Sequence, residues 1–334
     1  MNFNIDAQFL ELLKQTANDD LNVAMAAQIQ FGSAIAEVLR EGTLVGDVVT
    51  GLFELMPLNT NSTFEMPLDL LAPGTENQHV AYTSPGFGRI PHRYVEGDYI
   101  RVPTYKVTSS IDWKLDYARD AQYPVVQRAL NVLRAGFTKK INDDGWHVIL
   151  AAAADRNILV YDGDANAGQF TKRLVSLMKT VMRRNGGGNT ASLGRRKLTD
   201  LALSPEGIED IRNWGVDQID EVSRREIYVA GDGADSLMRV FGVNLIDLDE
   251  FGEGQEYQTY YTGSLGGSLQ ASDVELVVGL NANPNNKSLI MPMREDLRIF
   301  ADPAAHRSAM ESYYGWMQFG VASLESRDLI LGSF

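Results

Sequence analysis

The sequence contains no cysteine among its 334 residues. Disulfide bonds, thiolate nucleophiles and cysteine-ligated zinc or iron–sulfur sites are therefore excluded. No stretch approaches the roughly 18 consecutive apolar residues that a membrane-spanning helix needs. The N-terminal segment MNFNIDAQFLELLKQ lacks a basic region followed by an apolar run, so we expect no secretory signal. These absences favour a cytoplasmic setting and no membrane partner.

Catalytic motifs are missing as well. No P-loop, dinucleotide-binding fingerprint or Gly-x-Ser-x-Gly elbow occurs in the sequence. The four histidines do not have the spacing of metal ligands: His79, His92, His147 and His306. The sequence therefore predicts no catalytic residue, no cofactor and no metal site.

One acidic loop resembles the start of a calcium-binding loop. Asp162, Asp164 and Asn166 have the alternating spacing of calcium ligands. However, Gly168 comes one place late, and the twelfth position holds Arg173 where a glutamate is needed. We interpret this segment as a solvated acidic turn.

Negative charge dominates the composition. The chain has 44 acidic and 30 basic residues, a net charge of −14 and a pI of about 4.8. Such a chain is soluble and self-repelling, and is not a general DNA binder. Against this background, a small basic cluster stands out at Arg89, His92, Arg93 and Arg101. We expect it to pair with acidic residues of a neighbouring copy, and the alternative is a solvated loop face.

The chain is organised around a long amphipathic helix predicted over residues 121–154. Its apolar residues recur at helical spacing and form one face: Val125, Val126, Ala129, Leu130, Leu133, Phe137 and Ile141. Asp120 can cap the helix, and Pro124 suits its first turn. Gly136 and Gly145 each weaken it by up to about 1 kcal/mol relative to alanine, which makes either one a candidate site for a kink or break.

The segment before this helix divides into two parts. Residues 5–40 read as two helical pieces ended by Glu41-Gly42. Their predicted buried positions are Phe9, Leu10, Leu13 and Ala17, then Leu21, Met25, Ile29, Ile35 and Leu39. Residues 43–105 hold six of the eleven prolines and alternating runs at 62–66 and 94–102, which is typical of a two-stranded arm with an irregular tip. Since a two-stranded ribbon is marginal alone, we expect it to lie against another chain; a flap over an active site is the alternative.

The rest of the chain predicts short alternating elements. Strands are expected at 106–113, 158–161, 198–203, 227–229 and 243–247, and helices at 170–184, 204–214 and 217–224. Ser204 should cap the helix that opens with Pro205. Residues 253–269 read as a loop, and 274–279 and 287–293 as a strand pair around a turn. The aromatic run at 313–321 is typical of a central strand.

The order of these parts resembles the major capsid proteins of tailed bacteriophages, which have the Hong Kong 97-type fold. The most informative pieces are SSIDWKLDYARDA before the long helix and the closing YGWMQFGVASLESRDLILGSF. The resemblance implies an α+β shell protein with four parts. These are an N-terminal helical arm (1–49), an extended β-hairpin loop (50–105), a peripheral domain (106–165 and 281–334) with a spine helix (120–154), and an axial α/β domain (166–280).

The same resemblance implies a function and partners. The subunit would self-assemble as hexamers and pentamers into an icosahedral shell of the virion, built in the host bacterial cytoplasm. It would enclose double-stranded DNA without recognising it specifically. A portal and a decoration protein would be its further partners. Because the arm begins directly after Met1, we expect a separate scaffolding protein. The alternatives are an encapsulin-type nanocompartment shell and an α/β enzyme with a flap over its site.

Some members of that family join subunits by an isopeptide bond from a lysine on the extended loop. This sequence has no lysine between Lys14 and Lys106. We therefore expect no such cross-link.

Overall fold

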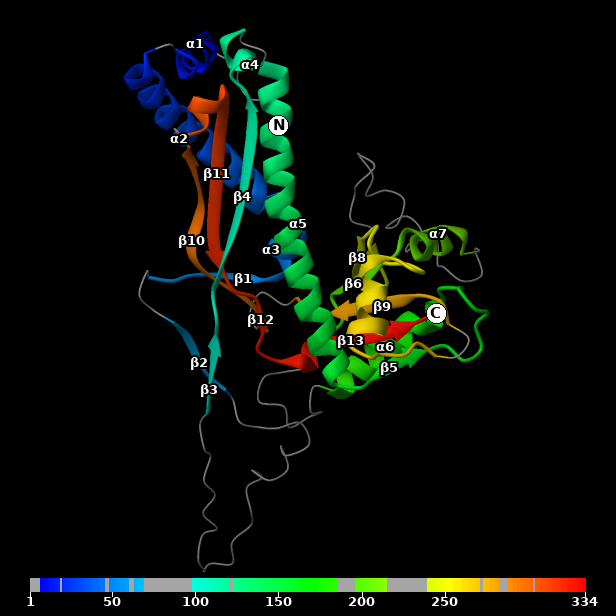
Figure 1. Ribbon diagram of the computed structural model, residues 1–334. Helices are drawn as coiled ribbons and strands as arrows, with labels where there is room; N and C mark the ends of the chain where they lie inside the picture. The colour runs from blue at the N-terminus through cyan, green and yellow to red at the C-terminus, as the bar shows by residue number, and fades with distance from the viewer. Residues whose placement is uncertain are drawn as a thin grey trace, which may run out of the picture. The chain divides into compact units, whose positions relative to one another are not determined.

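The computed structural model describes residues 7–18, 20–45, 48–59, 63–68, 98–120, 123–185, 196–214, 239–270, 273–282, 288–302 and 304–334 (Figure 1). The chain is divided into two compact units, each built from three segments. Unit 1 comprises Met1–Glu65, Arg101–Gly145 and Ile290–Ala322, and unit 2 comprises Met66–Ile100, Trp146–Leu289 and Ser323–Phe334. In the described ranges, no helix combines the length and apolar character needed to span a membrane.

The sheet of unit 1 has the strand order β1-β10-β11-β4. Its strands are β1 (Glu54–Pro57), β10 (Leu289–Ala301), β11 (Met310–Phe319) and β4 (Tyr105–Lys114), and β12 (Ala322–Ser323) also pairs with β10. Strand β1 runs parallel to β10, while β11 is antiparallel to both β10 and β4. The predicted strand at 106–113 is confirmed as β4, and the predicted central strand at 313–321 is confirmed as β11.

One face of this sheet is buried under helices α2 (Leu21–Val45) and α5 (Tyr123–Asp155). Tyr313 on β11 packs against the rings of Phe31 on α2, at 5.7 Å, and of Trp113 on β4, at 5.0 Å. Two residues later, a side chain at Gly315 would lie 3.4 Å from the ring of Phe137 on α5. Alternation along the strand therefore places one set of residues of β11 in the core of unit 1.

The predicted long helix is confirmed as α5, which continues through both glycines. Its buried residues in unit 1 are Val126, Leu130, Leu133, Phe137 and Ile141. The prediction for Val125 was wrong, because this residue lies on the exposed side. Asp120 ends the short helix α4 (Leu115–Arg119) as its C-cap. At Gly145, a Cβ atom would lie 2.3 Å from Val49 Cγ1, so glycine permits a close approach there.

The N-terminal part is helical, as predicted, but longer. Helices α1 (Ala7–Thr16), α2 and α3 (Val48–Leu52) precede β1. The expected end at Glu41-Gly42 was wrong, because α2 continues through Val45. Leu13 and Ala17 are buried, as the α1 pattern predicted.

The described residues include the base of the predicted ribbon, which is a two-stranded sheet. It pairs β2 (Phe64–Leu68) with β3 (Asp98–Val102). The described strands overlap the predicted runs at 62–66 and 94–102. The expected irregular tip of the ribbon falls outside the described residues.

Unit 2 contains a six-stranded sheet in the order β5-β13-β9-β6-β8-β7. The strands are β5 (Leu159–Tyr161), β13 (Leu329–Ser333), β9 (Leu276–Leu280), β6 (Asp200–Leu203), β8 (Val243–Asp247) and β7 (Arg239–Val240). Strand β9 is antiparallel to both of its neighbours, β13 and β6, while β6 is parallel to β8. Strands β13, β6 and β8 therefore all start at one edge of the sheet and end at the other.

Helices α6 (Lys172–Asn185) and α7 (Pro205–Asn213) share one hydrophobic core with this sheet. Leu174 and Met178 of α6 are fully buried, as predicted. Ser204 caps α7 as predicted, because its Oγ accepts a hydrogen bond from Gly207 N at 3.1 Å. The predicted helix at 217–224 and strand at 227–229 lie outside the described residues.

Two predictions for unit 2 were wrong. Residues 253–269 are not simply a loop, since α9 (Glu256–Thr259) and a π-helical turn, η3 (Tyr260–Ser264), lie within them. Burial favours these turns, because Tyr257 packs edge-on against Phe251 at 5.5 Å. The segments at 274–279 and 287–293 do not pair, since β9 and β10 belong to different sheets. All five residues of β9 are buried between β13 and β6, and these long-range partners displace the expected local hairpin.

Candidate functional site

Helix α2 is apolar on two faces. Phe31 and Ile35 form the inner face and are fully buried. Leu21, Met25 and Ile29 follow at intervals of four residues on another face, where Leu21 is 51% and Ile29 is 64% exposed. The sequence prediction that Leu21 and Ile29 are buried is therefore wrong for the single chain. We call Leu21, Met25 and Ile29 the outer stripe of α2.

Helix α5 has a similar outer stripe in unit 1. Val125 and Val132, seven residues apart, are both exposed, and Val132 is 61% exposed. Gly136 continues this line, and a Cβ atom there would meet nothing within 4 Å. Exposed valine on a long helix is a candidate contact residue for another chain.

The base of the β2–β3 ribbon carries an exposed ion pair. Arg101 Nε lies 2.7 Å from Glu65 Oε1, and the two side chains are 76% and 40% exposed. Pairs as exposed as this contribute at most about 1 kcal/mol, so Arg101 can exchange partners at little cost. Of the four basic residues predicted to contact a neighbour, Arg101 alone is in the described ranges; Arg89, His92 and Arg93 fall outside them.

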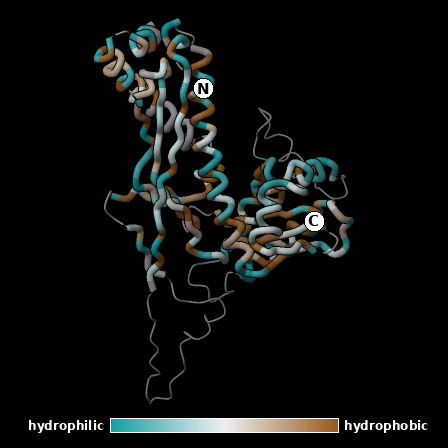
Figure 2. The backbone as a smooth tube through the Cα atoms, in the orientation of Figure 1, coloured by the Kyte–Doolittle hydropathy of each residue, from teal (hydrophilic) through white to brown (hydrophobic). Residues whose placement is uncertain are grey.

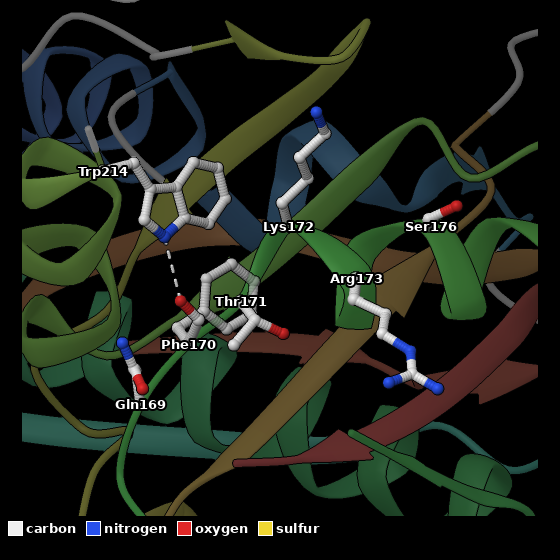
Figure 3. Close-up of a pocket in the computed structure, with 7 residues that line it drawn as sticks. All are labelled: Gln169, Phe170, Thr171, Lys172, Arg173, Ser176 and Trp214. Carbon is white, nitrogen blue, oxygen red and sulfur yellow. Dashed lines mark hydrogen bonds between the residues drawn. The ribbon is translucent and has the colours of Figure 1, made fainter. Parts of the chain in front are cut away.

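Unit 2 contains a pocket of about 450 Å³ at the start of α6, lined by Gln169, Phe170, Thr171, Lys172, Arg173, Ser176 and Trp214 (Figure 3). Trp214 Nε1 donates a hydrogen bond to Phe170 O at 3.0 Å, and the two rings stack with their centroids 6.0 Å apart. Figure 3 shows Lys172 and Arg173 extending in different directions. The Lys172 ammonium lies 5.4 Å from the ring centroid of Phe241. Phe170 and Trp214 therefore form a stacked aromatic wall in which the indole N–H already has a hydrogen-bond acceptor.

The acidic loop that resembles a calcium site folds onto this helix start. Thr171 Oγ1 donates to Asp162 Oδ2 at 2.6 Å and accepts from Leu174 N at 3.2 Å. Arg173 pairs with Asp162 at 3.4 Å and also with Asp164. The guanidinium group therefore occupies the carboxylates that a cation would need. Thr171 caps the N-terminus of α6, and Asp162 of the loop holds the Thr171 hydroxyl.

His147 on α5 belongs to an aromatic cluster of unit 2. Its ring stacks on Tyr260 with the centroids 4.0 Å apart, and Tyr257 lies edge-on at 6.1 Å. Across the described ranges, no three His, Asp or Glu side chains converge as metal ligands would. This environment is that of a packed structural histidine.

Unit 2 also holds a buried ionic network that the sequence patterns did not reveal. Arg196, 4% exposed, pairs with Glu325 at 2.5 Å and with Asp328, which is 1% exposed. Asp328 also accepts from Asn281 Nδ2 at 2.8 Å, and Glu325 pairs with Arg327. The network joins the segment before β6 to the turn before β13. Its members lie far apart in the sequence, so no local signal could have found it.

No protein-family model matches the chain, and no curated protein matches it in sequence. Solved structures do match. A structure from Microbacterium phage Oxtober96 has a TM-score of 0.53 at 11% identity, covering 86% of this chain and 90% of the other. One from Mycobacterium phage Bobi has a TM-score of 0.52 at 12% identity, with 86% and 89% covered. The capsid structure of cyanophage P-SCSP1u has a TM-score of 0.50 at 16% identity, with 86% and 87% covered.

These matches establish the fold of the chain. It is the α+β, Hong Kong 97-type fold of phage capsid proteins, as the sequence predicted. These structural neighbours are capsid proteins and not enzymes. At sequence identities of 11–16%, the matches establish the fold of the chain but not its role.

Proposed function

We propose that this chain is a major capsid protein, which self-assembles as hexamers and pentamers into the icosahedral shell of a tailed phage. The observation that carries the proposal is the extent of the fold match, which covers 86% of this chain and 90% of a phage protein. The shell would enclose double-stranded DNA in the virion and assemble in the host bacterial cytoplasm. A scaffolding protein, a portal and a decoration protein complete the proposed partners.

In this proposal, the parts of the chain take the roles of a shell subunit. Residues 1–49 form the helical arm and 50–105 the extended loop. Residues 106–165 and 281–334 form the peripheral domain around the spine helix at 120–154. Residues 166–280 form the axial domain.

The outer stripes of α2 and α5 support assembly. A shell is closed by repeating one set of complementary contacts between identical subunits. Ile29 and Val132 lie in water in the single chain, each exposed by more than half. Covering such side chains is favourable by about 25 cal/mol for each Å² of apolar surface removed from water. Neighbouring subunits would provide that cover.

The ribbon and its basic residues supply a second proposed contact. A two-stranded ribbon is marginally stable alone, so a neighbour would support it. Arg89, His92, Arg93 and Arg101 would pair there with acidic groups of that neighbour. Charge reversal at Arg89 and Arg93 should weaken assembly. Unchanged assembly of that variant would contradict this contact.

The net charge of −14 fits a container for DNA. Each cation that neutralised a phosphate would add a salt-dependent attraction to the wall. An acidic wall holds the genome by enclosure and leaves it free to move.

Negative-stain electron microscopy with sedimentation velocity tests the function directly. Closed particles, or discrete hexamers and pentamers, are expected from the purified chain or from its co-expression with a scaffolding protein. Particles filled with double-stranded DNA support the phage role, and particles filled with a protein cargo would identify a nanocompartment. A chain that stays monomeric after co-expression with candidate scaffolds contradicts the proposal.

Matched substitutions locate the contacts. Ile29→Lys should reduce assembly, whereas Gln30→Lys, at an exposed polar position of the same helix, should not. On α5, Val132→Lys should reduce assembly and its neighbour Asn131→Lys should not. Each pair adds the same charge to the same helix, so a difference within a pair reports contact and not net charge.

A further inference from the structure

Helix α6 is strongly basic on its exposed side. It carries five basic residues and no acidic one. Its apolar side is buried in the core of unit 2, through Leu174, Val175, Met178 and Met182. At about 100° per residue, the exposed residues of α6 fall on one continuous polar face of about 120°. This face consists of Lys172, Ser176, Thr180, Arg183 and Arg184. We call these five residues the basic face of α6.

The acidic groups near α6 are already paired with other cations. At the start of the helix, Asp162 and Asp164 pair with Arg173. Asp328, in a turn that contacts α6, pairs with the buried Arg196. These carboxylates are therefore not available to neutralise the basic face.

Three cations of the basic face have no ion-pair partner within the described ranges, and these are Lys172, Arg183 and Arg184. Lys179 lies at the margin of the face and is set apart from them, because it is partly buried and donates a hydrogen bond to Phe241 O at 2.5 Å. From Lys172 to Arg184 the helix extends about 18 Å, at about 1.5 Å per residue. The face is thus a row of available positive charge along one helix.

Helix α7 of the same core has the opposite character. Figure 2 shows α7 as largely hydrophilic. Its charged residues are Glu206, Glu209, Asp210 and Arg212, and Arg212 pairs with Glu209 at 3.5 Å. Of these two helices, α6 is therefore the one that attracts negative charge.

We propose that the basic face of α6 binds the phosphate backbone of double-stranded DNA. This inference rests on the proposed shell function, which brings DNA into the particle, and it names where the subunit contacts that DNA. Arginine, lysine and serine side chains commonly donate hydrogen bonds to phosphate oxygens. Such contacts position the duplex without reading its sequence, which agrees with enclosure of DNA without specific recognition.

The dimensions of the face suit several phosphates at once. Duplex DNA carries about one phosphate for every 1.7 Å of its axis, so a face about 18 Å long spans about ten phosphates. Lys172, Arg183 and Arg184 can each reach one of them. The net charge of −14 opposes binding elsewhere on the chain, but exposed charges beyond the screening length of about 10 Å at 0.1 M salt act only weakly on this contact. The attraction is therefore local, and the DNA is held loosely.

A protein partner would fit a different kind of surface. The centre of a protein–protein interface is apolar and rich in aromatic residues, and charged residues are depleted there. The basic face contains no apolar or aromatic residue. Binding of another protein to this face is therefore kept as an outcome of the test.

Salt-dependent binding of the dissociated subunit to a double-stranded DNA fragment tests the proposal, with fluorescence anisotropy as the readout. Three phosphate contacts should give a slope of about −2.7 in a plot of log affinity against log salt, a loss of about 40-fold between about 50 and about 200 mM. R183Q/R184Q removes two contacts and should reduce the slope to about −0.9. R183K/R184K should keep the slope of the parent, because lysine retains the charge.

R119Q/R128Q is the matched control, since it removes the same charge at two exposed arginines of unit 1. It should bind DNA with the slope of the parent. An equal fall of the slope in this control would attribute the effect to net charge and overturn the proposal. A parent subunit that leaves the DNA fragment unbound at about 50 mM salt would also overturn it.

Electron microscopy scores assembly separately, so that the DNA contact and the shell function fail independently. R183Q/R184Q should form particles as the parent does. If this variant loses its particles but binds DNA as the parent does, the face contacts another protein and the DNA contact is refuted. A parent that forms particles but binds no DNA overturns the DNA contact alone. A parent that forms no particles with any candidate scaffold overturns the shell function, whatever its affinity for DNA.

Discussion

Two glycines of α5 provide a controlled test of how closely the helix packs in unit 1. Gly136 is exposed, and a Cβ atom there would meet nothing within 4 Å. Gly145 is buried, and a Cβ atom there would lie 2.3 Å from Val49 Cγ1 and 3.1 Å from Val49 Cγ2. Val49 is fully buried on α3 and has a stiff, branched side chain that cannot move aside. The same substitution should therefore stabilise the helix at Gly136 and fail to stabilise it at Gly145.

The magnitudes follow from two terms. Alanine favours the helix over glycine by about 1 kcal/mol, and this term is common to both variants. Overpacking a filled core costs about 1–3 kcal/mol, and only Gly145→Ala incurs it. Gly136→Ala should thus raise the free energy of unfolding by about 1 kcal/mol. The free energy of unfolding of the Gly145→Ala variant should be about 1–3 kcal/mol lower than that of the Gly136→Ala variant.

Urea unfolding of the dissociated subunit, with hydrogen exchange of the α5 amides, measures the stability of both variants. Adding Val49→Ala should relieve the clash, so the double-mutant cycle of Val49 and Gly145 should give a coupling of about 1–3 kcal/mol. If Gly145→Ala stabilises the helix as much as Gly136→Ala does, the close approach of α3 and α5 is refuted.

Three further predictions concern other parts of the chain. Arg196→Met should destabilise unit 2 by about 3–5 kcal/mol in thermal unfolding, because it leaves the buried Asp328 without its cation; Lys197→Met, at an exposed position next to it, should change stability by less than about 0.5 kcal/mol. The raised pKa of Glu275 favours the folded state below its ordinary value of 4.5, and this contribution is lost as the pH rises through the folded pKa. Glu275→Gln should therefore gain stability relative to the parent as the pH rises above the ordinary pKa of 4.5, and a urea-midpoint difference that does not change with pH would contradict this. Mature particles should give a single subunit band on a denaturing gel, and a ladder of covalent multimers would refute the absence of an isopeptide link.

The local spacing of apolar residues was sufficient to predict the long helices and strands. Helix α5 was predictable because apolar residues such as Leu130, Leu133 and Phe137 repeat at helical spacing over many turns. Strands β4 and β11 were predictable because their side chains alternate. The Ser204-Pro205 pair marked the start of α7 in the same way, since capping depends on neighbours in the sequence. The resemblance to phage capsid proteins depended on the order of such elements, and the matching structures agree with it.

The sequence predicted the apolar stripes of the candidate contact surfaces but not whether those stripes are exposed. The pattern of α2 contained Leu21, Met25 and Ile29, and it also contained Phe31 and Ile35 on another face. Periodicity shows that a stripe is apolar but not whether its own chain covers it. The sheet of unit 1 covers one stripe and leaves the other exposed, and this selection identifies the outer stripe as a candidate contact.

Strand partners, the close approach at Gly145 and the buried ionic network around Arg196 were decided by the tertiary structure alone. Strands β9 and β10 follow each other in the chain, yet each pairs with strands distant in sequence because burial on both sides outweighs a local turn. The network brings Arg196, before β6, to Glu325 and Asp328, before β13. In the sequence Arg196 is more than 120 residues away from both carboxylates. What the sequence determined was each element and its apolar face, since these depend on residues a few positions apart; which faces and charges come together depends on contacts that only the folded chain makes.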